Sequence, residues 1–234
     1  LIAYRSVSTA ASDIAACGGS LKWILISLTV SNKDLSWMRG FVSGLKNFSD
    51  DYSCPVLGGD LSKGAQENIS VTVCGELNKG NFLKRGGAKE GDSIFITGTL
   101  GQAKKGLELI KKNIAQIDLS SRHVKKFLSP KLNFEFAKEI SSIASSCIDV
   151  SDGLISDLGH ILEASKVGAE IYIEKIPLVG EVEDALTWGD DYELLLTISL
   201  DQKKRLIEVS KRFDVGISEI GKITKEPNLR VIEK

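Results

Sequence analysis

Helical and strand segments alternate irregularly along this chain of 234 residues. Between residues 2 and 16, apolar side chains recur with the helical period of about 3.6 residues, and Gly18-Gly19 ends the segment. Between residues 68 and 77, Ile69, Val71 and Val73 alternate with small polar side chains, which is the period of a half-buried strand. Strands and helices do not alternate one for one, as they do in a doubly wound sheet, so the sequence predicts an α+β (mixed α/β) fold.

The same reasoning places the other elements and one linker. Helices are expected at residues 2–16, 35–48, 102–113, 121–128, 134–143, 153–165 and 201–213, and strands at residues 22–30, 55–57, 68–77, 93–99, 147–150, 170–174, 192–198 and 217–223. The segment 78–88 is rich in Gly, Lys and Asn, as linkers are. We therefore expect two domains, residues 1–79 and residues 80–234.

Charge and cysteine usage exclude several classes of protein. Thirty basic and thirty-one acidic residues leave a formal net charge of -1, so no overall field attracts nucleic acid or an anionic membrane. The four cysteines are scattered without a metal-ligand spacing, which favours a reduced, cytoplasmic setting. The apolar run at residues 23–30 is too short to span a bilayer. We expect neither a nucleic-acid partner nor a membrane partner.

Four short acidic motifs occur where predicted strands or helices meet turns. They are Ser12-Asp13, Gly58-Gly59-Asp60, Asp149-Val150-Ser151-Asp152-Gly153 and Gly189-Asp190-Asp191-Tyr192-Glu193. Each motif alone is most often a plain turn or a helix cap. Four together indicate a site, and carboxylate oxygens on short stems suit magnesium, which shares its coordination with water and phosphates. The motifs therefore predict one cleft between the domains in which carboxylates and magnesium meet.

The third motif is the most informative, because it sets two carboxylates three positions apart between a strand and a helix. Both carboxylates can face one ion only if the chain bends near Ser151. The positive end of the helix after Gly153 would favour nearby phosphate or carboxylate charge. Ser151 itself could cap that helix or contact a phosphate.

Known phosphate-binding motifs are missing. The chain has no G-x-x-x-x-G-K-[ST] sequence, no complete dinucleotide fingerprint and no protein-kinase set of motifs. Phosphate handling would therefore depend on carboxylate-held magnesium and on scattered basic residues.

The acidic motifs together resemble those of the thiamine-monophosphate kinases, in the superfamily of aminoimidazole ribonucleotide synthetase. The run from Ser12 to Gly19 is similar to that family's Ser-Asp-[Ile/Leu]-Ala-Ala-Met-Gly-Ala, and Gly58 to Ser62 to its Gly-Gly-Asp-Thr-Thr. Further similarities lie in Arg85 to Asp92, Thr97 to Gly101, Asp149 to His160 and Gly189 to Leu195. The order and spacing agree over nearly the whole chain. Among the departures, Asp190 replaces the usual Glu and Cys17 the usual Met.

The resemblance implies transfer of the γ-phosphate of ATP to thiamine monophosphate, giving thiamine diphosphate by direct in-line transfer without a nucleophilic side chain. The resemblance implies that Mg²⁺ is held by Asp13, Asp60, Asp149 and Asp152. It implies that ATP is bound by Gly59, Asp60, Arg85 and Ser151, with Arg85 stabilising charge. The thiamine substrate would lie toward Asp190 and Asp191.

The resemblance also implies a two-domain fold of the aminoimidazole ribonucleotide synthetase type. Its N-terminal domain binds ATP and magnesium and forms a barrel across a homodimer, and its C-terminal domain is α/β. Compared with the family, this chain is incomplete at the start of the first domain and at the end of the second. Two alternatives stay open: another ATP-using enzyme of the same superfamily, or a nucleotide-binding module without catalysis.

Overall fold

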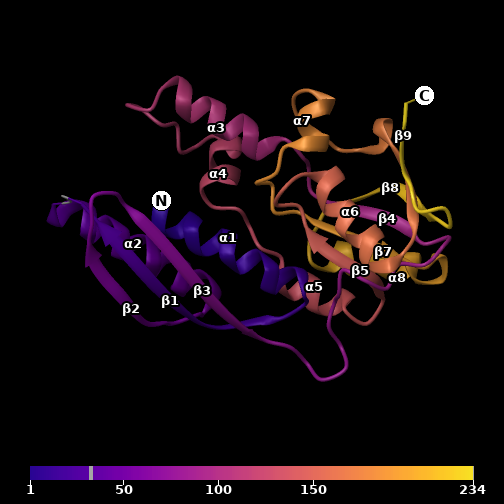
Figure 1. Cartoon of the computed structure of the whole chain (residues 1–234), viewed down its shortest axis with the longest axis horizontal. Coiled ribbons are helices and arrows are strands. Elements are labelled where there is room, and N and C mark those ends of the chain that lie inside the picture. Colours follow the sequence, from indigo (N-terminus) through magenta and orange to yellow (C-terminus); the bar gives the residue numbers. More distant parts are fainter. Residues whose placement is uncertain (32–33, 234) are drawn as a thin grey trace.

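The computed structural model describes residues 1–31 and 34–233, and its strands form two sheets (Figure 1). The elements around the first sheet are α1 (Ile2–Ala16), β1 (Ser20–Val30), α2 (Leu35–Tyr52), β2 (Val56–Lys63) and β3 (Asn68–Glu76). Those around the second are β4 (Ser93–Thr97), α3 (Gln102–Lys112), α4 (Arg122–Leu128), α5 (Phe134–Ile140), β5 (Ala144–Asp149), α6 (Leu154–Ser165), β6 (Gly168–Tyr172), α7 (Val182–Thr187), β7 (Leu194–Ile198), α8 (Lys203–Arg212), β8 (Ile217–Thr224) and β9 (Leu229–Ile232), with single 3-10 turns at Ile173–Lys175 and Leu200–Gln202.

The first sheet has the order β2-β1-β3, in which β1 runs parallel to β2 and antiparallel to β3. Every second residue of β1 is buried, at Ile24, Ile26 and Leu28, and these side chains share one core with α1 and α2. Val71 of β3 pairs with Ile26 and packs on the same core. The alternation predicted for β3 is therefore confirmed, and it fixes which face of the sheet meets α1.

The second sheet has the order β5-β7-β4-β8-β6-β9, and helices cover both of its faces. Ile94 and Ile96 of β4 share a core with α6, whereas Phe95 between them shares a second core with α5 and α8. All five residues of β4 are buried for that reason. The apolar run Ile94-Phe95-Ile96 at the centre of β4 fits a strand that is buried on both faces. The predicted mixed α/β architecture is confirmed.

Three elements differ from the sequence-based expectation. The strand β2 continues through Gly58, Gly59 and Asp60, which we had read as a turn. A Cβ atom at Gly59 would lie 1.7 Å from the carbonyl oxygen of Ile26, so glycine serves here to let two backbones approach closely. The short elements α7 and β9 were not predicted at all. No helix or strand lies between β3 and β4, where the boundary near residue 80 was predicted.

Helix α1 connects the two sheets. It packs against α2 and β3 on one side and against α4, α5 and β5 on the other. Side-chain contacts cross this junction, and in two of them the Ser12 hydroxyl donates to Asp149 over 2.7 Å and Arg5 forms an ion pair with Asp190 over 2.8 Å. In the described part of the chain, no helix is both long enough and apolar enough to cross a membrane.

Two glycines inside helices allow a test of the packing of α3 against α4. A Cβ atom at Gly106 of α3 would lie 2.1 Å from the carbonyl oxygen of His123, whereas a Cβ atom at Gly40 of α2 would meet nothing within 4 Å. Alanine stabilises a helix interior by about 1 kcal/mol relative to glycine. We expect Gly40→Ala to raise the free energy of unfolding by about 0.5–1 kcal/mol and Gly106→Ala to lower it, because α4 must move. Urea unfolding measures both, and an equal gain for the two variants would contradict the packing described.

Candidate functional site

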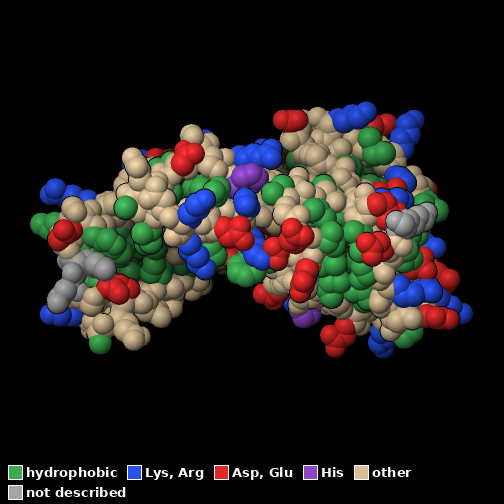
Figure 2. All heavy atoms as spheres, turned by 90° about the horizontal axis from the view of Figure 1, so that it is seen from above, with side chains coloured by type: hydrophobic (Ala, Val, Ile, Leu, Met, Phe, Trp, Pro, Cys, Tyr) green, Lys and Arg blue, Asp and Glu red, His purple; other side chains and the backbone are tan. Residues whose placement is uncertain are grey.

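A cavity of about 400 Å³ opens between the two sheets, next to α1. Its lining comes from one face of α1, from β3, from the end of β5 with the loop after it, and from the segment before β7: Ser6, Thr9, Ala10, Asp13, Ile69, Val71, Asp149, Ser151 and Tyr192. Charged side chains of both signs gather where the two halves of the molecule meet (Figure 2). A larger hollow of about 550 Å³ lies beside Tyr52 and Phe134, but no predicted site residue lines it.

Asp149 is the most unusual group in this cavity. It is 3% exposed, and its carboxylate accepts a hydrogen bond from the Ser12 hydroxyl. Burial raises the pKa of Asp149 to about 6, and the nearby negative charge of Asp13 acts in the same direction. Among the described residues no basic side chain forms an ion pair with Asp149. A buried carboxylate without a cation, beside a second carboxylate, is an arrangement that a divalent cation would stabilise.

Asp13 and Arg85 lie at the exposed edge of the cavity. The Arg85 guanidinium is 3.9 Å from the Asp13 carboxylate, and both side chains are more than half exposed. Two backbone hydrogen bonds hold the segment before Arg85, because Leu83 N donates to Cys17 O and Cys147 N donates to Lys84 O. The segment thus contacts both the end of α1 and β5, which explains why a residue far from Asp13 in sequence reaches it.

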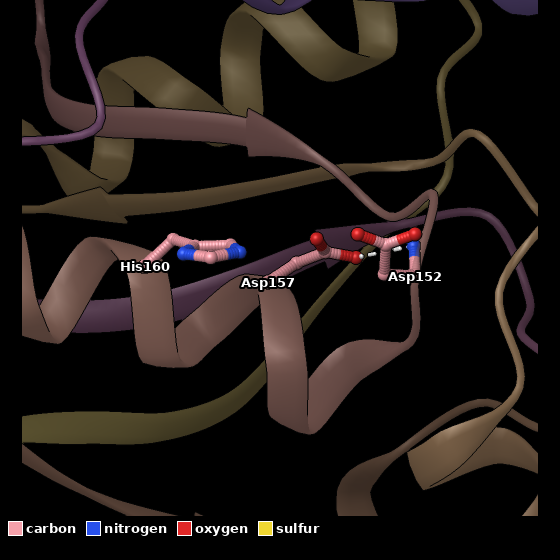
Figure 3. Close-up of side chains that lie close together, drawn as sticks. All are labelled: Asp152, Asp157 and His160. Atoms are coloured by element: carbon pink, nitrogen blue, oxygen red, sulfur yellow. Dashed lines mark hydrogen bonds between the residues drawn. The ribbon is translucent and has the colours of Figure 1, made fainter.

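The bend predicted near Ser151 is present, but it separates the two aspartates of the motif. Ser151 lines the cavity with Asp149, whereas Asp152 points toward Asp157 and His160 of α6 (Figure 3). In the described part of the chain these last three residues form the one group of three metal-ligand side chains whose ligand atoms lie within 4.8 Å of one another.

The backbone amides of the loop that precedes α6 are not free to bind a phosphate. One carboxylate oxygen of Asp157 accepts hydrogen bonds from the backbone N–H groups of Ser151, Asp152 and Gly153, over 3.0, 3.0 and 3.1 Å. The residue at the N-cap position is Gly153, not Ser151. The negative charge next to the start of α6 is therefore the chain's own Asp157 carboxylate, which is one of the two kinds of anion expected there.

Asp60 lies outside the cavity. In the register of the first sheet it is opposite Ser27, which is opposite Ser70 of β3. Side chains opposite one another on neighbouring strands share a face, and Ile26 and Val71 occupy the other face, toward α1. The structure therefore brings Asp13 and Asp149 together but places Asp60 on the far side of the sheet. The expected convergence of four aspartates in one cleft is wrong for Asp60 and Asp152 in this conformation.

Asp190 is held at the junction of the sheets. Its backbone has a φ of +68°, and its carboxylate pairs with Arg5 of α1 and accepts a hydrogen bond from the Tyr192 hydroxyl over 3.1 Å. The Arg5 guanidinium also lies 3.8 Å from the centre of the Phe127 ring. Because Tyr192 lines the cavity, Asp190 lies next to its rim.

Asp191 has a structural role that the sequence did not reveal. It is fully buried, and its carboxylate accepts hydrogen bonds from the backbone N–H groups of Gly101 and Ala103, at the start of α3, over 2.5 and 2.9 Å. It therefore satisfies orphan amides of that helix. The Asp191 carboxylate points into the protein, and the expected place of Asp191 toward the substrate stays a prediction.

Sequence reasoning missed several residues of this region. Ser12 was named only as the neighbour of Asp13, although its hydroxyl holds Asp149. Arg5 carries no local signal beyond its place on α1, and the ion pair between Lys126 and Glu193 joins residues 67 positions apart. Asp157 could have been suspected, because an acidic residue in the first turns of a helix can accept from amides at its start.

Comparisons with known proteins agree with this architecture. Residues 1–77 match the family described as AIR synthase related protein, N-terminal domain, and residues 89–234 match its C-terminal domain. The thiamine-monophosphate kinase of Buchnera aphidicola (subsp. Schizaphis graminum) is 36% identical over 99% of this chain and 76% of its own length. The enzyme of the same name from Escherichia coli K12 is 32% identical over 96% of this chain and 73% of its own length.

Solved structures give the same result. The structure of AaThiL complexed with AMPPCP and TMP has a TM-score of 0.88 and 32% identity, and the match covers 98% of this chain and 76% of that chain. The hydrogenase maturation protein HypE of E. coli has a TM-score of 0.82 at 13% identity, which shows a shared fold alone. On the family matches and on relatives above 30% identity, the chain belongs to the thiamine-monophosphate kinases, a family of AIR synthase related proteins.

Proposed function

We propose that this chain transfers the γ-phosphate of ATP to the phosphate of thiamine monophosphate, which gives thiamine diphosphate. The names of the relatives and the bound AMPPCP and TMP of AaThiL support this reaction. Within the structure, the observation that carries the proposal is the buried Asp149 carboxylate, which faces a cavity beside Asp13 without a basic partner. Such a pair is suited to a cation that accompanies phosphates.

We propose that Asp13 and Asp149 hold Mg²⁺. Their carboxylates are hard oxygen donors that line one cavity, so the residues fit the ion. When bound there, the ion would neutralise charge on the phosphate oxygens of the nucleotide. Asp60 and Asp152 do not line this cavity, and their roles as ligands stay predictions.

The remaining residues serve to align two negatively charged reactants. Because donor and acceptor phosphates repel each other, catalysis requires neutralisation of charge and a fixed geometry, not a nucleophilic side chain. We propose that Arg85, at the exposed edge, stabilises phosphate charge and that the Ser151 hydroxyl donates to a phosphate oxygen. Gly59 remains a predicted contact to ATP. Asp190, next to the cavity rim, is proposed to attract the positively charged thiazolium ring.

We also propose a cytoplasmic homodimer that forms through the first sheet. The four cysteines are free thiols, as in a reducing compartment. All eight residues of the edge strand β2 are exposed, so its outer backbone groups are available to pair with another strand.

Light scattering should give twice the mass of one chain, and a monomer mass at micromolar concentration would contradict this pairing.

Asp149→Asn tests the proposed function most directly. It keeps the shape of the side chain but removes the charge that a magnesium ion requires. We expect thiamine diphosphate formation to fall by more than about 100-fold, beyond the loss typical of an indirect contact. Turnover is measured across a magnesium titration, with Asp92→Asn as a control, because Asp92 is also buried and accepts a backbone N–H group, that of Lys89. Near wild-type turnover of Asp149→Asn at limiting magnesium would contradict the assignment.

The same variant has an opposite effect on stability in the absence of magnesium. Burial raises the pKa of Asp149 from 3.8 to about 6, so the folded chain binds more protons than the unfolded chain between those values. The wild-type protein should therefore lose stability as the pH rises from about 4 to about 6. Asp149→Asn lacks this loss and should be more stable at pH 7 by about 1–3 kcal/mol. Parallel curves of unfolding temperature against pH for the two proteins would contradict the burial argument.

A further inference from the structure

Asp157 lies in the first turn of α6 with its side chain directed back toward the loop that precedes the helix (Figure 3). It is 1% exposed, and a single carboxylate oxygen accepts the N–H groups of three consecutive residues, Ser151, Asp152 and Gly153. Three successive amides that converge on one point normally form a binding site for an anion. Here the chain itself supplies the anion.

The loop held in this way is also fixed from its other side. Ser151 O accepts the N–H group of Asp190 over 3.0 Å, and Val150 O accepts the N–H group of Tyr192 over 2.9 Å. A Cβ atom at Gly189 would lie 1.8 Å from Ser151 O, so the two segments are in the closest contact that glycine permits. The backbone of Ser151 thus has its N–H group on Asp157 and its C=O group on Asp190, and only its side chain remains to face the cavity.

We propose that Asp157 is a positioning residue for phosphoryl transfer, a role that rests on the proposed function. By binding the three amides it holds Ser151, and through Val150 the Asp149 carboxylate, in the orientation that lines the cavity. It also occupies the three amides of this loop, so that a nucleotide phosphate at the cavity meets the Ser151 hydroxyl and not these amides. Asp157 itself does not line the cavity.

The test compares Asp157→Asn and Asp157→Ala with two controls. Asparagine retains one neutral acceptor oxygen, and alanine retains none, so the three hydrogen bonds weaken in that order. We expect the magnesium and ATP concentrations for half-maximal rate to rise about 10 to 100-fold in Asp157→Asn and further in Asp157→Ala, as for other residues that orient a ligand. The KM for thiamine monophosphate should rise less than these two concentrations, because Arg5 and the Tyr192 hydroxyl also hold the Asp190 carboxylate at the thiamine end.

The first control, Asp92→Asn, separates positioning from stability. Asp92 is 4% exposed and accepts a hydrogen bond from the Lys89 amide and one from the Ser145 hydroxyl. Ser145 lies at the start of β5, whereas Asp149 lies at its end. Asp92→Asn should lower the unfolding temperature and leave the magnesium requirement unchanged. If Asp157→Asn does the same, Asp157 is only structural and the proposal is overturned.

The second control, His160→Asn, separates positioning from metal binding. His160 lies within 4.8 Å of Asp152 and Asp157, but no hydrogen bond joins it to the loop at residues 151–153. If Asp157 acts by positioning the loop, the magnesium concentration for half-maximal rate in His160→Asn should equal that of the wild-type protein. An equal rise in His160→Asn and Asp157→Asn would show that the two side chains act as metal ligands, and the positioning role would be rejected.

Amide hydrogen exchange in the wild-type protein measures the hydrogen bonds between Asp157 and this loop independently of catalysis. The N–H groups of Ser151, Asp152 and Gly153 precede the helix, yet they should exchange at least about 10-fold more slowly than in Asp157→Asn. Fast exchange of these amides in the wild-type protein would overturn the proposal even if both variants fail to fold. If the wild-type protein forms no thiamine diphosphate, the proposed function fails, and slow exchange would still support the role of Asp157 in fixing this loop.

Discussion

The hydrogen bond from Ser12 to Asp149 connects the two sheets at the point where the cavity opens. It joins α1, which belongs to the core of the first sheet, to the last residue of β5 in the second. A carboxylate this deeply buried is unfavourable when ionised unless hydrogen bonds and a cation compensate it. The hydroxyl of Ser12 supplies one part of that compensation, and the proposed magnesium ion supplies the other. The arrangement of the two sheets and the chemistry of the cavity therefore depend on the same group.

Four aspartates in and near the cavity fall into two physical classes. Asp149 and Asp13 face the cavity, whereas Asp157 binds the amides of the loop before α6 and Asp191 binds amides at the start of α3. The amides that the second class binds are not available to a phosphate, so we expect side chains to contact the phosphates. Each internal carboxylate satisfies backbone groups that would otherwise be unpaired.

Much of the fold could be predicted because apolar periodicity is a local property. The alternation of Ile69, Val71 and Val73 identified both the strand and its buried face. Glycine is ambiguous in this respect: at Gly59 it permits close strand pairing, which looks the same in sequence as a turn. The site could be predicted only in part for a related reason. Asp190 and Asp191 are neighbours in sequence, yet one lies at the junction of the sheets and the other binds α3, and only the left-handed backbone at Asp190 and Tyr192 separates them.

The central claim is that a cation binds at Asp149 between α1 and the end of β5. A crystal structure with Mn²⁺ and a nonhydrolysable ATP analogue tests it most directly, because anomalous scattering locates the manganese without reference to the assigned roles. The account predicts an anomalous peak within about 2.5 Å of an Asp149 carboxylate oxygen, with Asp13 on the same ion or on a neighbouring one. Anomalous peaks confined to Asp152, Asp157 and His160, or to the far face of the first sheet at Asp60, would contradict it.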